Sequence, residues 1–182
     1  LGYGGAETGC YDLAHFLPEH DSKSFIVTSG GQLLQFVDKK KVKVFKLPVH
    51  SKNPILILFN TIIISFIILI YNINVVHARS RAPAWSCFLA TKFTFRKFVT
   101  TFHGTYNYNN SVKKFYNSIM VRSDLVIAGS NFIFSHINDN YGNFFFNKRR
   151  KLLVIFRGIN TNYFNPQKVL PIKLDKFSKQ YK

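Results

Sequence analysis

The stretch KFVTTFHGTY, residues 97–106, decides the fold that this sequence predicts. Residues 98–102 are all β-branched or aromatic, which is typical of a short buried strand. His103 and Gly104 follow at once, where the strand would end and a loop would begin. In open α/β sheets, ligands bind outside the carboxyl ends of the strands. His103 is therefore a candidate ligand-binding residue, with a purely structural histidine as the alternative, and Gly104 would let a ligand approach the backbone.

Outward from this stretch, strand-like segments alternate with helical ones along the chain. Strands are predicted over residues 24–28, 42–47, 75–77, 125–128 and 152–156. Helices are predicted over residues 6–17, 32–38, 55–71, 82–91, 111–121 and 131–141. Strands that alternate with helices form a parallel sheet covered by helices on both faces, so we expect an α/β fold of this kind.

Polar residues suited to ligand binding gather at the ends of the predicted strands. They are Ser29, Arg79, Ser80, Arg81, His103, Ser130 and Arg157. Because the carboxyl ends of parallel strands meet at one edge of a sheet, these side chains would line one crevice. Arg79 and Arg81 offer two guanidinium groups that suit a phosphate or a carboxylate, with a solvated basic loop as the alternative. Gly158 would likewise let the backbone near Arg157 approach a phosphate.

Gly4 and Gly5 stand directly before the first predicted helix. Backbone N–H groups at a helix N-terminus, together with the helix dipole, favour a bound anion. The dinucleotide pattern G-x-G-x-x-G is not met, because Glu7 stands where the third glycine belongs. An ordinary loop is the alternative interpretation of the two glycines.

The charge of the chain points to an anionic partner. Its 25 lysines and arginines against 8 acidic residues give a net charge of +17, which favours nucleic acid, an acidic membrane surface or a phosphate-bearing substrate. No aromatic-interleaved basic pattern supports nucleic acid. The absence of a D-x-D pair argues against a carboxylate-held metal. The histidines without metal-ligand spacing, interpreted as surface or packing residues, are His15, His20, His50, His77 and His136.

Residues 55–71 form an almost wholly apolar segment of 17 residues. A membrane-spanning helix needs about 20 residues, so this segment lies at the short limit. It is followed by another strand-like stretch, which favours a helix that the rest of the protein covers. A spanning helix is the alternative, because periodicity alone does not separate the two cases.

Five stretches, in this order along the chain, resemble the N-terminal domain of family 4 glycosyltransferases, especially bacterial enzymes that extend lipopolysaccharide or related surface glycans. They are GGAETGCYDLAHFL, VVHARSRAPAW, FVTTFHGTY, SDLVIAGSNFI and VIFRGIN. The resemblance covers about residues 2–166 and implies one Rossmann-like half of the GT-B fold. In that fold the N-terminal domain mainly holds the acceptor and the C-terminal domain holds the nucleotide-sugar. We therefore expect a domain over residues 1–166 and a basic tail or interdomain linker over residues 167–182.

The resemblance also implies roles for individual residues. His103 corresponds to the histidine that approaches the transferred sugar and is the expected catalytic residue. The expected donor-binding residues are Gly4, Gly5, Ser130, Arg157 and Gly158. The expected acceptor-binding residues are Arg79, Ser80 and Arg81. Such enzymes retain the anomeric configuration, use a nucleotide-sugar as donor, and need neither a metal nor another cofactor.

The sequence departs from the family pattern in three places. The first strand of the family and its whole C-terminal domain have no counterpart here, and Asn160 replaces the usual aspartate. The resemblance therefore implies a truncated or split enzyme, inactive alone, which a separate C-terminal glycosyltransferase chain would complete. We expect it in the cytoplasm, peripheral on the anionic inner face of the cell membrane, with a lipid-linked glycan as acceptor. The alternative is a noncatalytic basic module that binds anionic glycolipid or nucleic acid.

Overall fold

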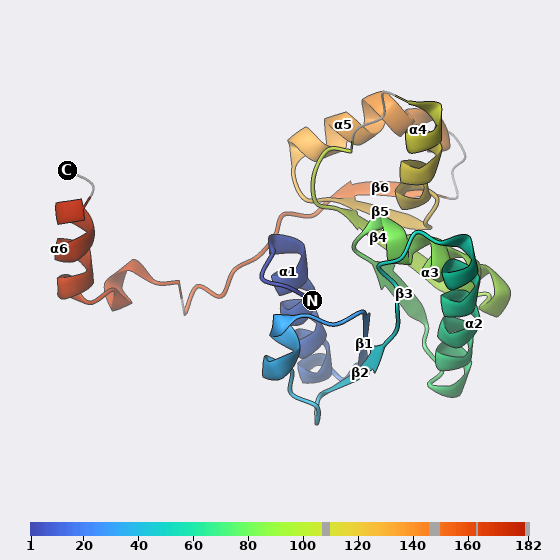
Figure 1. The fold of residues 1–182 in the computed structure, drawn as a ribbon. Helices are drawn as coiled ribbons and strands as arrows, with labels where there is room; N and C mark the ends of the chain where they lie inside the picture. Colours follow the sequence, from blue (N-terminus) through green and yellow to red (C-terminus); the bar gives the residue numbers. More distant parts are fainter. Residues whose placement is uncertain (107–109, 146–149, 163, 181–182) are drawn as a thin grey trace.

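The computed structural model describes residues 1–106, 110–145, 150–162 and 164–180 (Figure 1). Its strands are β1 (Ser24–Thr28), β2 (Val42–Lys46), β3 (Val75–Ala78), β4 (Lys97–Phe102), β5 (Leu125–Ala128) and β6 (Lys151–Val154). Its α-helices are α1 (Gly5–Phe16), α2 (Pro54–Ile70), α3 (Arg81–Thr94), α4 (Ser111–Asn117), α5 (Asn131–Tyr141) and α6 (Pro171–Gln180). Short 3-10 turns lie at Leu17–His20, Gln32–Phe36, Ser118–Val121, Gly142–Phe144 and Pro166–Lys168.

Every pair of described strands is parallel, which confirms the α/β class. The strands divide into two sheets, β1-β2 and β3-β4-β5-β6, rather than forming the single sheet that the alternating pattern predicts. A cavity of about 860 Å³ separates them, and β1, β3, α1 and α2 all contribute to its lining. Within the described part of the chain, β1 and β3 are not paired with each other, and residues of both strands line this cavity.

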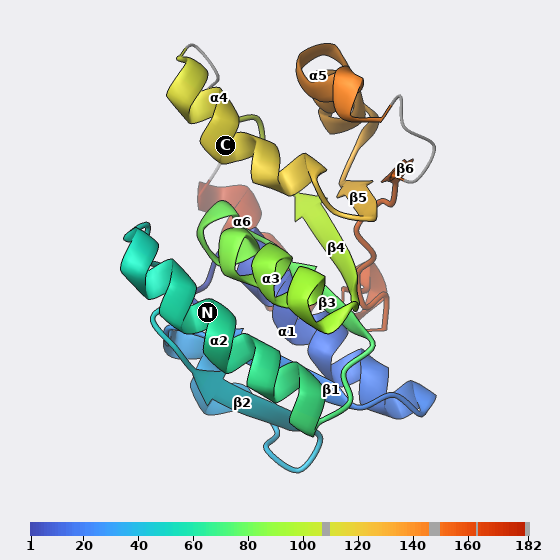
Figure 2. The same ribbon diagram turned by 90° about the vertical axis from the view of Figure 1, so that its right-hand side faces the viewer.

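The core lies around β4 and β5. Phe98 and Phe102 of β4 and Val126 of β5 are buried, as the run of β-branched and aromatic residues predicts. Full burial of a phenylalanine contributes about 2–3 kcal/mol, so this strand anchors the larger sheet. Helices α2 and α3 lie on one side of β3 and α1 lies on the other (Figures 1 and 2). This arrangement places the N-terminus of α1 near the carboxyl ends of the larger sheet.

The expectation that the rest of the protein covers residues 55–71 is wrong, because one side of helix α2 is exposed. The helix begins at Pro54, and the side chain of Asn53 caps it by accepting a hydrogen bond from the Ile55 N–H at 2.9 Å. One side of α2 packs on α3, and the opposite side is exposed. Because α2 packs against the rest of the protein on one side only, a segment that is apolar all round keeps an apolar outer surface. None of the described helices is long and apolar enough to cross a membrane.

Several predicted segments differ from the observed ones. The helix predicted over residues 111–121 divides into α4 and a 3-10 turn, and the last predicted strand ends at Val154 instead of residue 156. The basic tail contains α6, which stands apart from the rest of the protein at the end of an extended segment (Figure 1). Within α6 the Lys179 ammonium lies 2.7 Å from the Asp175 carboxylate, a spacing of one helical turn that supports isolated helices.

Candidate functional site

The N-terminus of α1 forms the centre of the candidate site. Gly4 is the N-cap residue, Gly5 is the first helical residue, and no side chain of the described residues caps this end of the helix. The Thr8 hydroxyl donates to the Gly4 carbonyl at 3.1 Å, which holds the first turn together. The backbone N–H groups of this turn and the positive end of the helix dipole can attract an anion, and the Glu7 carboxylate beside Gly4 offsets part of that positive charge.

Arg157, which follows β6, lies against this first turn. Its guanidinium Nη1 donates to the Gly5 carbonyl at 2.5 Å, and its Nη2 donates to the Thr8 hydroxyl at 2.8 Å. The same Nη2 is 3.4 Å from the Asp12 carboxylate in an exposed ion pair, which contributes little to stability. Through these contacts, a residue at the end of the sheet lies against a helix that is 149 to 152 positions earlier in the chain.

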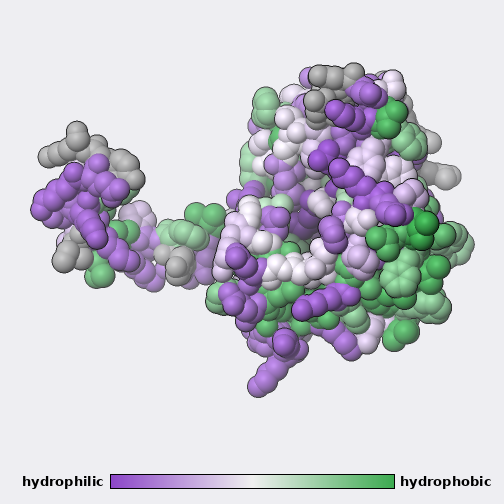
Figure 3. Space-filling model, viewed as in Figure 1, coloured by the Kyte–Doolittle hydropathy of each residue, from purple (hydrophilic) through white to green (hydrophobic). Residues whose placement is uncertain are grey.

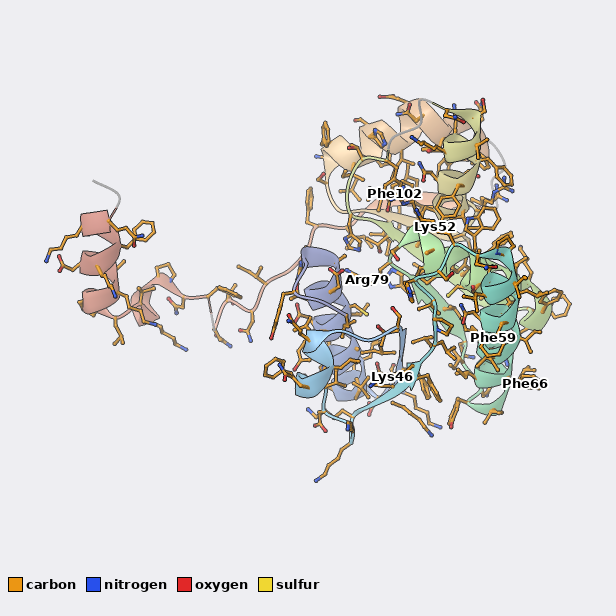
Figure 4. The ribbon with its side chains drawn as sticks, in the orientation of Figure 1. Lys46, Lys52, Phe59, Phe66, Arg79 and Phe102 are labelled. Carbon is orange, nitrogen blue, oxygen red and sulfur yellow. The ribbon has the colours of Figure 1, made fainter. Side chains whose placement is uncertain are left out.

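Arg79, which follows β3, reaches the same turn of α1 (Figure 4). Its Nε donates to the Ala6 carbonyl at 3.2 Å. Gly9 makes room for both arginines, since a Cβ atom there would lie 2.7 Å from Arg79 Nη2 and 3.5 Å from Arg157 Cζ. Two guanidinium groups therefore meet beside one helix terminus.

The electrostatics of this pair favour an anion. Partial burial lowers the pKa of Arg79, and the nearby Arg157 charge lowers it further. Asp12 and Glu7 on α1 act in the opposite direction. The two neighbouring guanidinium charges repel each other. A ligand with a doubly charged phosphate group would relieve this repulsion and accept charge-assisted hydrogen bonds from both arginines.

His103 lies at the edge of the same site. It follows β4 and its side chain is exposed, with open space around Gly104. Desolvation lowers the pKa of His103 to about 4, and the charges of Arg79 and Arg157 act in the same direction. At neutral pH the imidazole is therefore uncharged, so it offers one hydrogen-bond donor and one acceptor.

His77 lies beneath these residues, where the sequence indicated only a surface or packing residue. Its Nε2 is 2.7 Å from the Thr101 hydroxyl on the neighbouring strand β4. Burial lowers the pKa of His77 to about 4, with Arg79 and His103 as smaller causes. Thr101 is itself buried, so its side chain supports His77 and does not border open space.

The remaining predicted site residues occupy separate positions. The Ser130 hydroxyl caps α5 by accepting from the Ile133 N–H at 3.2 Å. Arg81 begins α3, where its Nη1 donates to Asn117 Oδ1 at 2.8 Å and its guanidinium lies 4.5 Å from the centre of the Tyr106 ring. Ser80 precedes α3 and is exposed, and Gly158 is exposed with open space around it.

The structure thus brings Gly4, Gly5, Arg79, Arg157 and His103 together, and it separates Arg79 from Arg81. This separation arises because Arg79 belongs to the loop after β3, whereas Arg81 belongs to the first turn of α3.

Sequence reasoning missed the contribution of the first turns of α1. The Thr8 hydroxyl accepts a hydrogen bond from Arg157, and the missing side chain of Gly9 makes room for Arg79. A glycine inside a helical pattern was the feature of the sequence that could have indicated this contact. Cys10 lines the cavity between the sheets, and burial raises the pKa of its thiol. Among the residues that the structure describes, no group of three or more His, Cys, Asp or Glu side chains could hold a metal ion.

The parallel strands with helices on both sides form a Rossmann-like domain. We call Arg79 and Arg157, together with the first turn of α1 that they contact, the cationic site. The sequence profile of Glycosyltransferase Family 4 matches residues 3–163. The chain therefore belongs to glycosyltransferase family 4, as the five sequence motifs imply. No curated protein matches the chain.

Solved structures place the chain in the GT-B fold. A glycosyltransferase from Rickettsia africae ESF-5 is 42% identical with a TM-score of 0.79, and the match covers 100% of this chain and 48% of that enzyme. HepE (Alr3699) from Anabaena, solved with UDP and glucose, is 15% identical with a TM-score of 0.66, and the match covers 98% of this chain and 47% of HepE. HepE with UDP-glucose gives a TM-score of 0.68 at 14% identity, covering 98% of this chain and 46% of HepE. The chain thus corresponds to the N-terminal half of these enzymes and spans about half their length.

Proposed function

We propose that the chain is the acceptor-binding half of a retaining, metal-independent glycosyltransferase. This enzyme transfers a sugar from a nucleotide-sugar to a lipid-linked surface glycan such as lipopolysaccharide. The observation that carries the proposal is the meeting of Arg79 and Arg157 at the uncapped N-terminus of α1, beside His103. Membership of family 4 supports it, as do the UDP and UDP-glucose that HepE holds in its crystal structures.

In this proposal the cationic site faces the diphosphate of the donor across the cleft between the two halves. Arg79, Arg157 and the N–H groups after Gly4 and Gly5 stabilise the negative charge that develops on the leaving diphosphate. Their hydrogen bonds to α1 already fix both guanidinium groups, so little reorganisation accompanies the reaction. Arg79 is thereby proposed for the donor side, next to Arg157.

His103 has a different role from the arginines. As a neutral imidazole it exchanges hydrogen bonds with hydroxyl groups of the transferred sugar and orients the reacting carbon. Ser130 and Gly158, which lie apart from the two arginines, are proposed to contact the donor from other parts of the cleft, and Ser80 and Arg81 remain on the side proposed for the acceptor. The chain supplies these groups only as one half, and a C-terminal half supplies the nucleotide-binding residues.

The acceptor defines where the enzyme works. A lipid-linked glycan is presented at a membrane, and the net charge of +17 attracts the chain to anionic lipid head groups. We place the protein on the cytoplasmic face of the cell membrane as a peripheral protein.

The test is a chimeric enzyme. In it, this chain replaces the aligned segment of the Rickettsia africae glycosyltransferase, which is 42% identical and supplies the remaining half. Incubation with radiolabelled nucleotide-sugars and bacterial membranes, in the presence of a chelator, should transfer label to a glycolipid with retained configuration. The chain alone should transfer none. A well-folded chimera that fails with every donor, or salt-sensitive binding of RNA by the chain in place of transfer, would contradict the proposal.

A further inference from the structure

Helix α2 is apolar on its outer side as well as its inner side: Ile64, Ile67 and Ile68 are buried, and large apolar side chains also face outward. Its polar residues Asn60 and Thr61 are buried, at 0% and 1% exposure. The Asn60 side chain donates to the Pro48 carbonyl, and the Thr61 hydroxyl donates to the Ile57 carbonyl. Large apolar residues with roughly half or more of their surface exposed are Ile55, Leu58, Phe59, Ile62, Phe66, Leu69 and Ile70. A soluble helix places its apolar stripe inward, so this arrangement indicates an apolar surrounding on the outer side.

The exposed residues form one continuous surface. Their spacing of three or four positions sets them on one side of the helix, and Phe93 of α3 extends the surface sideways. Ile62, Phe66, Leu69 and Phe93 line a shallow groove of about 260 Å³. We call this surface the α2 face. Figure 3 shows apolar residues gathered over α2, and Figure 4 shows Phe59 and Phe66 pointing away from the body.

Basic residues stand at both ends of the α2 face. Lys52 lies two positions before the helix and is exposed (Figure 4). At the other end the Lys43 ammonium lies 2.6 Å from the Tyr71 hydroxyl, and Arg96 donates to the Asn72 side chain at 2.8 Å. The apolar surface is therefore bounded by cations, as in helices that lie in the interface of a bilayer.

The surrounding sequence is free of negative charge. No acidic residue stands between Asp38 and Asp124, whereas fourteen lysines and arginines do. This stretch contains all of α2, α3 and the loops at both ends of the α2 face. A second copy of the chain docked through the same face would bring two such basic surfaces together, and like charges disfavour that contact. An anionic lipid surface complements both the charge and the apolar stripe.

We propose that the α2 face is a membrane-docking surface that inserts its exposed side chains among the head groups of an anionic bilayer. The helix lies parallel to the membrane plane with its apolar side about 5–10 Å into the head-group region. Lysines at its ends bind lipid phosphates, each raising the partition coefficient about fivefold, the equivalent of about 1 kcal/mol. The inference rests on the proposed function for its setting, because a lipid-linked acceptor would be met at this surface.

Vesicle co-sedimentation of the purified chain tests this proposal. We expect binding to phosphatidylcholine vesicles that contain about one third phosphatidylglycerol, weak binding to phosphatidylcholine alone, and weakening by salt. The double variant Phe59→Ser/Phe66→Ser should lower binding roughly tenfold or more, since it removes two inserted phenyl rings. The matched control is Phe36→Ser/Phe132→Ser, whose side chains are 56% and 71% exposed on other surfaces, and it should bind as the wild type does.

A second pair of variants tests the charges. Lys43→Gln/Lys52→Gln should weaken binding to the anionic vesicles about fivefold per residue. Lys113→Gln/Lys114→Gln removes the same charge from α4 and should have the smaller effect. Thermal unfolding of each variant should stay near that of the wild type, because the substituted side chains are exposed.

Three outcomes would overturn the proposal. They are no binding of the wild type to anionic vesicles, equal losses from both phenylalanine pairs, and a lipid-free dimer that Phe59→Ser/Phe66→Ser dissociates, which would assign the face to a second copy. Vesicle binding needs neither a sugar donor nor a C-terminal half. Its failure would therefore leave the proposed transferase intact, and failure of the chimera to transfer sugar would leave membrane docking intact.

Discussion

Gly9→Ala is a small change that should separate the binding role of the cationic site from its structural role. Gly9 lies inside α1, and a Cβ atom there would come within 2.7 Å of Arg79 Nη2. Neither atom has room for this contact, so the flexible end of Arg79 must move. The movement breaks the hydrogen bond from Arg79 Nε to the Ala6 carbonyl and turns the guanidinium away from Arg157.

Gly9→Ala should have a small effect on the free energy of unfolding and a larger effect on the affinity for a diphosphate. Replacing glycine by alanine inside a helix stabilises it by about 0.5–1 kcal/mol, and losing one hydrogen bond costs about 0.5–1.5 kcal/mol. The free energy of unfolding should therefore stay within about 1 kcal/mol of the wild-type value. Loss of one charge-assisted hydrogen bond to an anion costs about 1.5–3 kcal/mol, so the affinity for a diphosphate should fall roughly tenfold or more.

Urea unfolding and a titration with pyrophosphate, followed by NMR of backbone amides in α1, measure the two quantities. Gly142→Ala is the matched control, because a Cβ atom there makes only an ordinary 3.6 Å contact with Asn138 and lies far from the site in the fold. It should change neither stability nor pyrophosphate binding appreciably. A folded Gly9→Ala protein that binds pyrophosphate as tightly as the wild type would refute the assignment of Arg79 to the anion.

Two further predictions concern the histidines. In the chimeric enzyme, His103→Ala should lower turnover by roughly two decades with little change in stability, whereas His136→Ala on α5 should be nearly neutral; equal losses would make His103 a structural residue. Because the pKa of His77 is lowered to about 4 from 6.5, the folded protein binds fewer protons than the unfolded chain between these values. The stability that the neutral His77 contributes is complete above pH 6.5 and is lost as the pH falls to 4 and below, by about 3 kcal/mol. Urea unfolding across this range should show a steeper acid dependence for the wild type than for His77→Gln, and parallel curves would contradict the shift.

The parallel α/β fold follows from the sequence because its signals are local. Each buried strand is a short β-branched or aromatic run, and α5 spans the predicted residues 131–141. Whether β1 pairs with β3 is decided between residues far apart in the chain, which no local pattern records. The exposure of α2 was missed for a related reason. An all-apolar segment indicates burial, but the number of neighbours that pack on it is a property of the whole fold.

The candidate site was only partly predictable. Strand ends placed His103 and Arg157 at one edge of the sheet, as the rule for open α/β sheets states. The sequence could not separate Arg79 from Arg81, because the start of α3 falls between them and decides where each side chain points. It also could not show that α1 lies across this edge, since that contact joins residues about 150 positions apart.

The central claim is that Arg79 and Arg157 hold the donor diphosphate, and the most direct measurement is the rate of sugar transfer by the chimeric enzyme. Arg79→Gln/Arg157→Gln should lower the rate by roughly two decades or more, because it removes both charges that stabilise the leaving group. Lys113→Gln/Lys114→Gln removes equal charge from α4 and should leave the rate near that of the unmodified chimera. If a folded Arg79→Gln/Arg157→Gln chimera transfers sugar at the unmodified rate, the cationic site has no part in the reaction.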